Sequence, residues 1–121
     1  MLLVDADADM RHLLRDAVHE LGLQAAEATD GNGAIQQIRG VEPHVVLTDL
    51  WIPAGGFEYV RTIQALSPSC PIILLTAFLD HRTRAEAVAC GVKAFLAKPV
   101  RLGDIQRAII GVLDGEWELS D

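Results

Sequence analysis

The sequence contains little of what several broad protein classes require. It has two cysteines, Cys70 and Cys90, which are too few for a disulfide framework and lack the spacing of a metal site. No apolar run approaches the roughly 20 residues of a membrane-spanning helix. The first residues lack the basic region and the apolar stretch of a signal peptide. We therefore expect a cytoplasmic protein with no membrane segment, in which both cysteines are small buried residues.

Positive charge is also scarce. Ten lysines and arginines stand against 17 aspartates and glutamates, for a net charge of -7, which argues against direct nucleic-acid binding by this domain. No internal repeat or low-complexity segment is present. Half of the residues are hydrophobic, so the chain suits one domain with a single well-buried core. We expect that domain at residues 1–113, followed at 114–121 by an acidic tail or the start of a linker.

Apolar runs and helical stripes alternate along the chain. Short apolar runs predict strands at 1–5, 23–28, 45–49, 72–76 and 92–97. Apolar residues at helical spacing follow each strand, in the ranges 10–21, 34–38, 57–66, 81–90 and 102–113. The helix at 81–90 is expected to bury Ala85, Val88 and Ala89 on one face. Repeated strand–helix units with strands that are apolar on both faces predict an α/β fold, in which helices cover both sides of a parallel sheet.

Polar side chains gather where the expected strands end. Asp5 and Asp7 follow the first strand, Asp49 ends the third, Thr76 ends the fourth and Lys98 follows the fifth. A parallel sheet brings these ends to one edge, which is where ligands bind in open α/β folds. Carboxylate oxygens of this kind suit Mg²⁺, which typically takes one or two carboxylates plus waters and phosphate oxygens. Together with a lysine and a hydroxyl, the acids indicate a phosphoryl-transfer site.

The same residues form motifs that resemble the receiver domain of bacterial two-component response regulators. The resemblance covers nearly the whole chain, and four motifs in the right order carry it. It implies a flavodoxin-like doubly wound (βα)5 sandwich with a five-stranded parallel sheet in the order 2-1-3-4-5. It also implies a signalling switch rather than a conventional enzyme. The motifs are Val4-Asp5-x-Asp7, Thr48-Asp49-Leu50-x-x-Pro53, Leu75-Thr76-Ala77 and Lys98-Pro99.

The resemblance implies a role for each matching residue. Asp49 would accept phosphate from a phosphohistidine on a sensor histidine kinase or a phosphotransfer protein. Asp5, Asp49 and the backbone carbonyl of Trp51 would hold Mg²⁺. Thr76 and Lys98 would grip the phosphoryl oxygens. Phe95 would occupy the aromatic switch position, and the Lys98–Pro99 bond would be cis.

Partners are implied in the same way. The face made by the helix at 81–90, the strand at 92–97 and the last helix would relay the signal to an output partner or form a homodimer. Charges on or near this face would be available to either partner. The first helix would be the docking region for the kinase. The residues expected on the relay face are Arg82, Arg84, Lys93, Arg101 and Arg107, and those expected at the docking region are Arg11, Leu14, Arg15 and Val18.

The sequence departs from the family pattern at two places. Ala6 stands where the family usually has a second acid that binds the metal directly, so we expect weak Mg²⁺ binding unless Asp7 turns inward. The segment from Pro53 to Phe57 is one residue shorter than the usual loop beside the site. Trp51 and Phe78, each two residues after a site residue, would exclude water from an acyl phosphate and slow its hydrolysis.

Two other functions fit part of the pattern. In a haloacid-dehalogenase-like phosphatase Asp5 would be the nucleophile and Asp7 the acid/base, but Asp49 would then have no role, and only Asp104 offers a later acid. A pseudo-receiver, which is an unphosphorylated interaction module with the same fold, would explain Ala6 and the short loop. Some residues have plainer interpretations: Asp7 or Asp9 is expected to cap the first helix, and the four histidines, which lack metal-ligand spacing, are expected on the surface.

Overall fold

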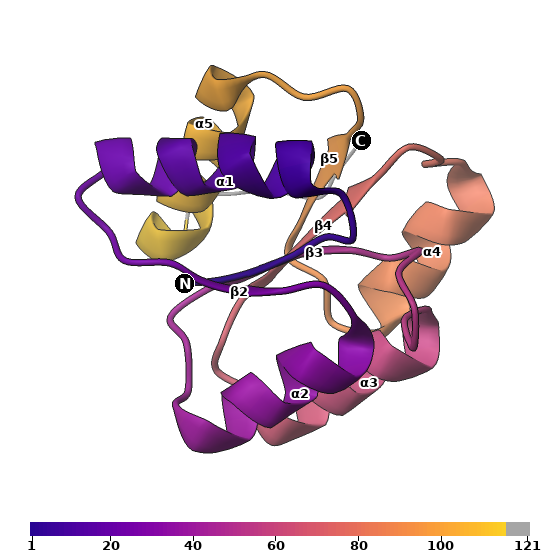
Figure 1. Cartoon of the computed structure of the whole chain (residues 1–121). Helices are drawn as coiled ribbons and strands as arrows, with labels where there is room; N and C mark the ends of the chain where they lie inside the picture. The colour runs from indigo at the N-terminus through magenta and orange to yellow at the C-terminus, as the bar shows by residue number, and fades with distance from the viewer. Residues whose placement is uncertain (116–121) are drawn as a thin grey trace.

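Short parallel strands form a sheet at the centre of the molecule (Figure 1). The computed structural model describes residues 1–115, and in that part the strand order is β2-β1-β3-β4-β5. Because helices cover both faces of such a sheet, its inner strands are mostly apolar and almost wholly buried, and β4 is buried at every position. This arrangement confirms the expected flavodoxin-like fold. The strands are β1 (Leu2–Val4), β2 (Ala26–Ala28), β3 (Val46–Asp49), β4 (Ile72–Thr76) and β5 (Ala94–Ala97).

One helix follows each strand, and the helices divide between the two faces of the sheet. Figure 1 shows α1 and α5 together on one side and α2, α3 and α4 on the other. Residues 1–115 include no helix that is long and apolar enough to cross a lipid bilayer. The helices are α1 (Ala8–Glu20), α2 (Gly31–Gly40), α3 (Phe57–Leu66), α4 (His81–Ala89) and α5 (Leu102–Asp114).

Alternation along the strands divides the core between these faces. Leu3, Leu47 and Ile73 pack with the apolar residues of α1 and α5. Their neighbours Leu2 and Val46 pack with α2 and α3 on the other side. This is the period-two pattern of a strand that is buried on both faces. The core therefore fixes the register of the strands, and with it the positions of the side chains at their carboxyl ends.

The expected second strand is wrong at its start. It was expected at 23–28, but β2 comprises only Ala26–Ala28. Gly22 has a positive φ of 77°, and the backbone N–H of Leu23 bonds back to the carbonyl of Val18. Residues 23–25 therefore complete the exit from α1, and pairing with β1 begins only afterwards.

The expected buried face of the fourth helix is also wrong. Ala85, Val88 and Ala89 are exposed, whereas Ala87 is buried. Cys90, directly after the helix, is buried on the same side. Small alanines lie around the whole helix, so the apolar pattern selects no face, and packing against the sheet decides which residues are buried.

Aspartates begin three of the helices. Asp30 and Asp80 cap α2 and α4 through backbone N–H groups three residues on. The cap of α1 is Asp7, whose carboxylate accepts from the N–H of Asp9 at 3.0 Å. Of the two aspartates expected as the cap of this helix, Asp7 is therefore confirmed, and Asp9 lies in the first turn.

Other expectations about single residues are confirmed. Cys70 and Cys90 are buried and unpaired, and the four histidines are exposed. The Lys98–Pro99 bond is cis. Asp114 is still part of α5, and Gly115 caps that helix with a positive φ of 71°. Of the expected acidic tail, residues 116–121 lie outside the described part of the chain.

Candidate functional site

The ammonium group of Lys98 lies between two carboxylates at the carboxyl edge of the sheet. Its Nζ is 2.8 Å from Oδ2 of Asp5 and 2.8 Å from Oδ2 of Asp49. Asp5 follows β1, Asp49 ends β3 and Lys98 follows β5, so the parallel topology brings together residues that are up to 93 positions apart. The sequence predicted this convergence from the strand ends, and the structure confirms that these three side chains meet.

Burial makes this cluster electrostatically strong. The side chains of Asp5, Asp49 and Lys98 are 2%, 13% and 18% exposed. Burial opposes the charge of Lys98, but its hydrogen bonds to Asp49 and Asp5 outweigh that effect, so the pKa of Lys98 is raised above its ordinary value. The lysine is therefore a fixed positive charge at neutral pH, which binds either carboxylate oxygens or any anion that replaces them.

Backbone groups orient the two carboxylates. Oδ1 of Asp5 accepts from the N–H of Asp7 at 2.9 Å, and Oδ1 of Asp49 accepts from the N–H of Trp51 at 3.2 Å. Each acid thus uses one oxygen for its own loop and the other for Lys98. Asp49 is the more exposed of the two carboxylates.

Thr76 and Phe95 lie on the neighbouring strands. Thr76 is fully buried, and its hydroxyl oxygen accepts from the N–H of Phe78 at 3.2 Å. The N–H of Lys98 bonds to the Thr76 carbonyl at 2.8 Å, which links the ends of β4 and β5. Phe95 is half-buried, and the Arg84 guanidinium lies 5.3 Å from its ring centroid. The threonine is therefore close in the fold to Lys98, while Phe95 packs on the side of α4.

The donors at this edge fit Mg²⁺ with a small set of ligands. Asp5 and Asp49 converge on one cation, the Lys98 ammonium, and no backbone hydrogen bond of the described loop ends on the Trp51 carbonyl. Oxygen donors of this kind suit Mg²⁺. Asp7 does not join them, because its carboxylate caps α1. Within residues 1–115 no group of three or more His, Cys, Asp or Glu side chains is arranged to hold a metal.

The short loop after Asp49 has a well-defined conformation. Its backbone folds back through hydrogen bonds from the N–H of Gly55 to the carbonyl of Ile52 and from the N–H of Gly56 to the carbonyl of Leu50. The N–H of Gly31 in α2 donates to the carbonyl of Pro53 at 2.8 Å. A Cβ at Gly31 would lie 1.9 Å from the next carbonyl oxygen in the loop. The loop therefore packs directly on the start of α2, and only glycine fits there.

Sequence reasoning missed a buried link to the carbonyl of Asp49. The Thr48 hydroxyl donates to that carbonyl at 2.8 Å and lies 2.9 Å from the Tyr59 hydroxyl in α3. Burial, the dominant effect, raises the pKa of Tyr59 and keeps the phenol neutral. The helical stripe expected in α3 contained Phe57, Val60 and Ile63 but not this tyrosine. A polar residue next to an apolar stripe gives no signal of a buried hydroxyl partner on the preceding strand.

Two of the four residues expected to dock the kinase on α1 are not available. Leu14 and Val18 are fully buried in the core. Arg11 and Arg15 both pair with Glu27 of β2, at 3.3 and 2.9 Å. The expectation is therefore wrong for Leu14 and Val18, because they lie on the face of α1 that packs on the sheet. Docking at the partly exposed Arg11 and Arg15 stays a prediction.

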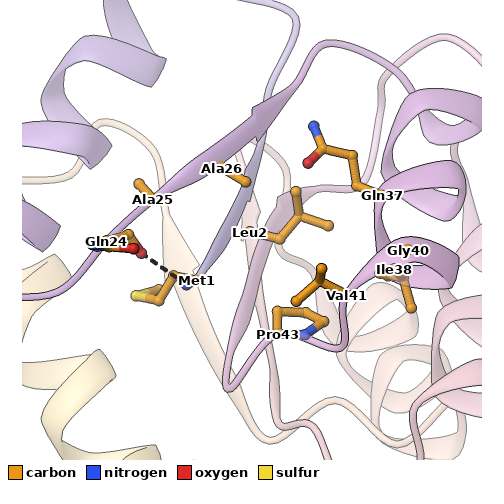
Figure 2. A pocket seen from close by; sticks show the side chains of 10 residues that line it. All are labelled: Met1, Leu2, Gln24, Ala25, Ala26, Gln37, Ile38, Gly40, Val41 and Pro43. Carbon is orange, nitrogen blue, oxygen red and sulfur yellow. Dashed lines mark hydrogen bonds between the residues drawn. The ribbon is translucent and has the colours of Figure 1, made fainter.

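Several pockets lined by the described residues lie away from this site. One of about 510 Å³ lies where β1 and β2 begin, at the opposite edge of the sheet from the carboxyl ends of the strands, and Figure 2 shows the side chains that line it. Among the residues that line it are Met1, Gln24 and Val41, and the chain's amino group donates to the Gln24 carbonyl at 2.9 Å. It contains none of the expected site residues, so the chemistry of the edge does not depend on it.

Comparison with known proteins indicates a family for this chain. A family model described as the response regulator receiver domain matches residues 1–110. The chemotaxis protein CheY of Thermotoga maritima is 30% identical over 111 residues, which cover 90% of this chain and 92% of that protein. The response regulator protein PilR of Pseudomonas aeruginosa is 30% identical over 113 residues, which cover 93% of this chain but 25% of PilR.

Solved structures agree on the fold. A CheY-like receiver domain protein from Methanospirillum hungatei has a TM-score of 0.89 at 21% identity, covering 95% of this chain and 93% of that one. A LuxR-family two-component response regulator from Aurantimonas has a TM-score of 0.86 at 25% identity, covering 97% of this chain and 86% of that one. With the family match over nearly all of the sequence, the chain therefore belongs to the response regulator receiver domains, the signalling switches of two-component systems.

Proposed function

We propose that this chain is a phosphorylation-controlled switch and that Asp49 is its phosphoacceptor. The observation that carries the proposal is the contact of Lys98 with both Asp49 and Asp5 at 2.8 Å. A carboxylate oxygen of Asp49 forms the new P–O bond while the P–N bond of a phosphohistidine breaks, and the leaving imidazole takes up a proton. Lys98 and the Thr76 hydroxyl stabilise the charge on the transferred group.

Mg²⁺, when bound, supplies further neutralisation of the phosphoryl oxygens. Asp5, Asp49 and the Trp51 carbonyl are the residues that would hold it. Because Ala6 supplies no carboxylate and Asp7 caps α1, we infer that affinity is lower than in a receiver with a second acid at this position. A titration that gave the usual affinity of the family would contradict this inference.

Signalling follows from the charge that phosphorylation adds, about −1.5 to −2 together with three acceptor oxygens. Thr76 and Lys98 move toward the new group, and Phe95 rotates into the space that Thr76 leaves. Phe95 must give up its contact with Arg84 to do so. The population shift changes the face of α4, β5 and α5, where exposed Val88 offers apolar surface for a homodimer or an output partner.

The lifetime of the phosphorylated state depends on two exposed aromatic residues. Trp51 and Phe78 are 61% and 68% exposed and follow Asp49 and Thr76 by two positions. The Trp51 ring packs edge-on against Phe57, with centroids 6.3 Å apart, which holds it near the site. We infer slow self-dephosphorylation. The Trp51→Ser, Phe78→Ser variant should lose phosphate faster, and an unchanged rate would contradict the idea.

A phosphorylation assay distinguishes the three candidate functions. The chain is incubated with acetyl phosphate and Mg²⁺, and acid-labile label is compared between the wild type, Asp49→Asn and Asp5→Asn. Label that Asp49→Asn abolishes supports the receiver function. Label that persists in Asp49→Asn but is lost in Asp5→Asn supports the phosphatase. An unlabelled wild type supports the pseudo-receiver. Two observations favour that alternative: Ala6 supplies no metal ligand, and the Asp7 carboxylate caps α1.

A further inference from the structure

Arg11 connects the acidic edge of the site to the outer strand of the sheet. Its Nη1 donates to the backbone carbonyl of Asp5 at 2.7 Å, and its Nε lies 3.3 Å from Oε1 of Glu27 on β2. The arginine side chain is 18% exposed. A planar guanidinium that binds two acceptors at once has little freedom to turn, so Arg11 is fixed by contacts to β2 and to the end of β1.

The Glu27 carboxylate is itself held from a second direction. Its other oxygen, Oε2, accepts from Arg15 at 2.9 Å, one turn further along α1. Glu27 therefore binds both arginines, one on each oxygen. Only Arg11 reaches the site, because Arg15 has no contact with Asp5 among the described residues.

We propose that Arg11 is a positioning residue that holds Asp5 in the geometry the site requires. Asp5 carries three of the contacts that shape this edge: its carbonyl binds Arg11, and its carboxylate binds Lys98 at 2.8 Å and the N–H of Asp7 at 2.9 Å. The turn from β1 to α1 contains the short side chain of Ala6, which is exposed and contributes no anchor. Arg11 supplies an anchor from outside the turn, in addition to the hydrogen bond from the Asp5 N–H to the Ala28 carbonyl at 3.2 Å.

The sign of the effect separates positioning from simple electrostatics. Removing a positive charge near an acidic site strengthens cation binding by Coulomb attraction alone. Removing a contact that orients a metal ligand weakens cation binding, typically by at least about tenfold. Arg11→Ala should therefore weaken Mg²⁺ binding by about tenfold. Arg15→Ala also removes one positive charge and one ion pair to Glu27, but it should leave Mg²⁺ binding unchanged or slightly tighter.

Two readouts test the proposal. The first is Mg²⁺ titration followed by Trp51 fluorescence in a background with Trp117→Phe. It rests on the proposed function, because it requires that the wild type binds Mg²⁺ at this edge. The second is amide hydrogen exchange of Asp7, whose N–H is bound to the Asp5 carboxylate. Exchange at Asp7 requires neither metal nor phosphate, so it tests the positioning role even if the chain is never phosphorylated.

The outcomes are distinct. Faster Asp7 exchange in Arg11→Ala than in Arg15→Ala, together with weaker Mg²⁺ binding, supports the proposal. Equal exchange in the two variants overturns it, as does Mg²⁺ binding that tightens in both. A wild type that binds no Mg²⁺ contradicts the proposed function, and Asp7 exchange still decides the role of Arg11. If Arg11→Ala does not fold, Arg11→Lys against Arg15→Lys makes the same comparison with the charge retained.

Discussion

Replacing Lys98 by methionine tests how strongly the site cluster contributes to stability. The Lys98→Met variant keeps most of the apolar stem but leaves the carboxylates of Asp5 and Asp49 without a cation. Breaking a buried ion pair by removing one partner costs about 3–5 kcal/mol. Lys98 and Asp49 keep 18% and 13% exposure, and the N–H of Asp7 still binds Asp5. We therefore expect a loss of about 2–3 kcal/mol in the free energy of unfolding.

The assay is urea unfolding at pH 7, with Lys93→Met as the matched control. Lys93 is an exposed lysine just before β5, and its substitution should change stability by less than about 0.5 kcal/mol. Combining Lys98→Met with Asp5→Asn should recover part of the loss, because the buried negative charge is then gone. If Lys98→Met lowers the free energy of unfolding by less than about 1 kcal/mol, which is what an exposed ion pair contributes, the reasoning is refuted.

Further predictions concern other parts of the same edge. Ala6→Asp should tighten Mg²⁺ binding by about tenfold, measured by calorimetry, because it adds a carboxylate ligand. Gly31→Ala should cost about 3 kcal/mol because the new Cβ meets loop backbone, whereas Gly40→Ala in the same helix should cost nothing in the same denaturation assay. Burial raises the pKa of Cys70 to about 11, so its alkylation at pH 7 should be at least about two orders of magnitude slower than in the unfolded chain. The pKa of Lys98 is raised from its ordinary 10.5, so its ion pairs should contribute fully to the free energy of unfolding below pH 10.5. This contribution should be lost as the pH rises through the pKa of Lys98 in the folded state, and Lys98→Met should show a smaller loss of stability over that range.

The fold was predictable because its signals are local and repeated. The inner strands β3 and β4 begin with apolar residues, and a helical stripe follows each of them, so both were identified with nearly their observed bounds. The errors fall where the local signal is weak. The strand β2 has one buried residue of three, and α4 has alanines on all sides, so tertiary packing alone decides their bounds and faces.

The site was predictable to the extent that topology determines it. A parallel sheet places every strand end at one edge, and this was enough to bring Asp5, Asp49 and Lys98 together. The supporting contacts were not accessible in the same way. The bond from Arg11 to the Asp5 carbonyl and that from Thr48 to the Asp49 carbonyl involve backbone acceptors, which leave no trace in the sequence.

Asp7 shows how one residue type permits two incompatible roles. An aspartate two positions after Asp5 fits both a metal ligand that turns inward and a helix cap. The cap prevails in the structure because the first free N–H groups of α1 require an acceptor. The consequence is a site with two carboxylates, and this is the physical basis for expecting weak metal binding.

The central claim is that Asp49 accepts the phosphoryl group. The most direct test is reduction of the phosphorylated chain with borohydride, which converts an acyl phosphate on aspartate to homoserine, followed by peptide mass mapping. The account predicts homoserine at position 49 and unmodified Asp5. Homoserine at position 5, or none at either position after treatment with acetyl phosphate and Mg²⁺, would contradict it.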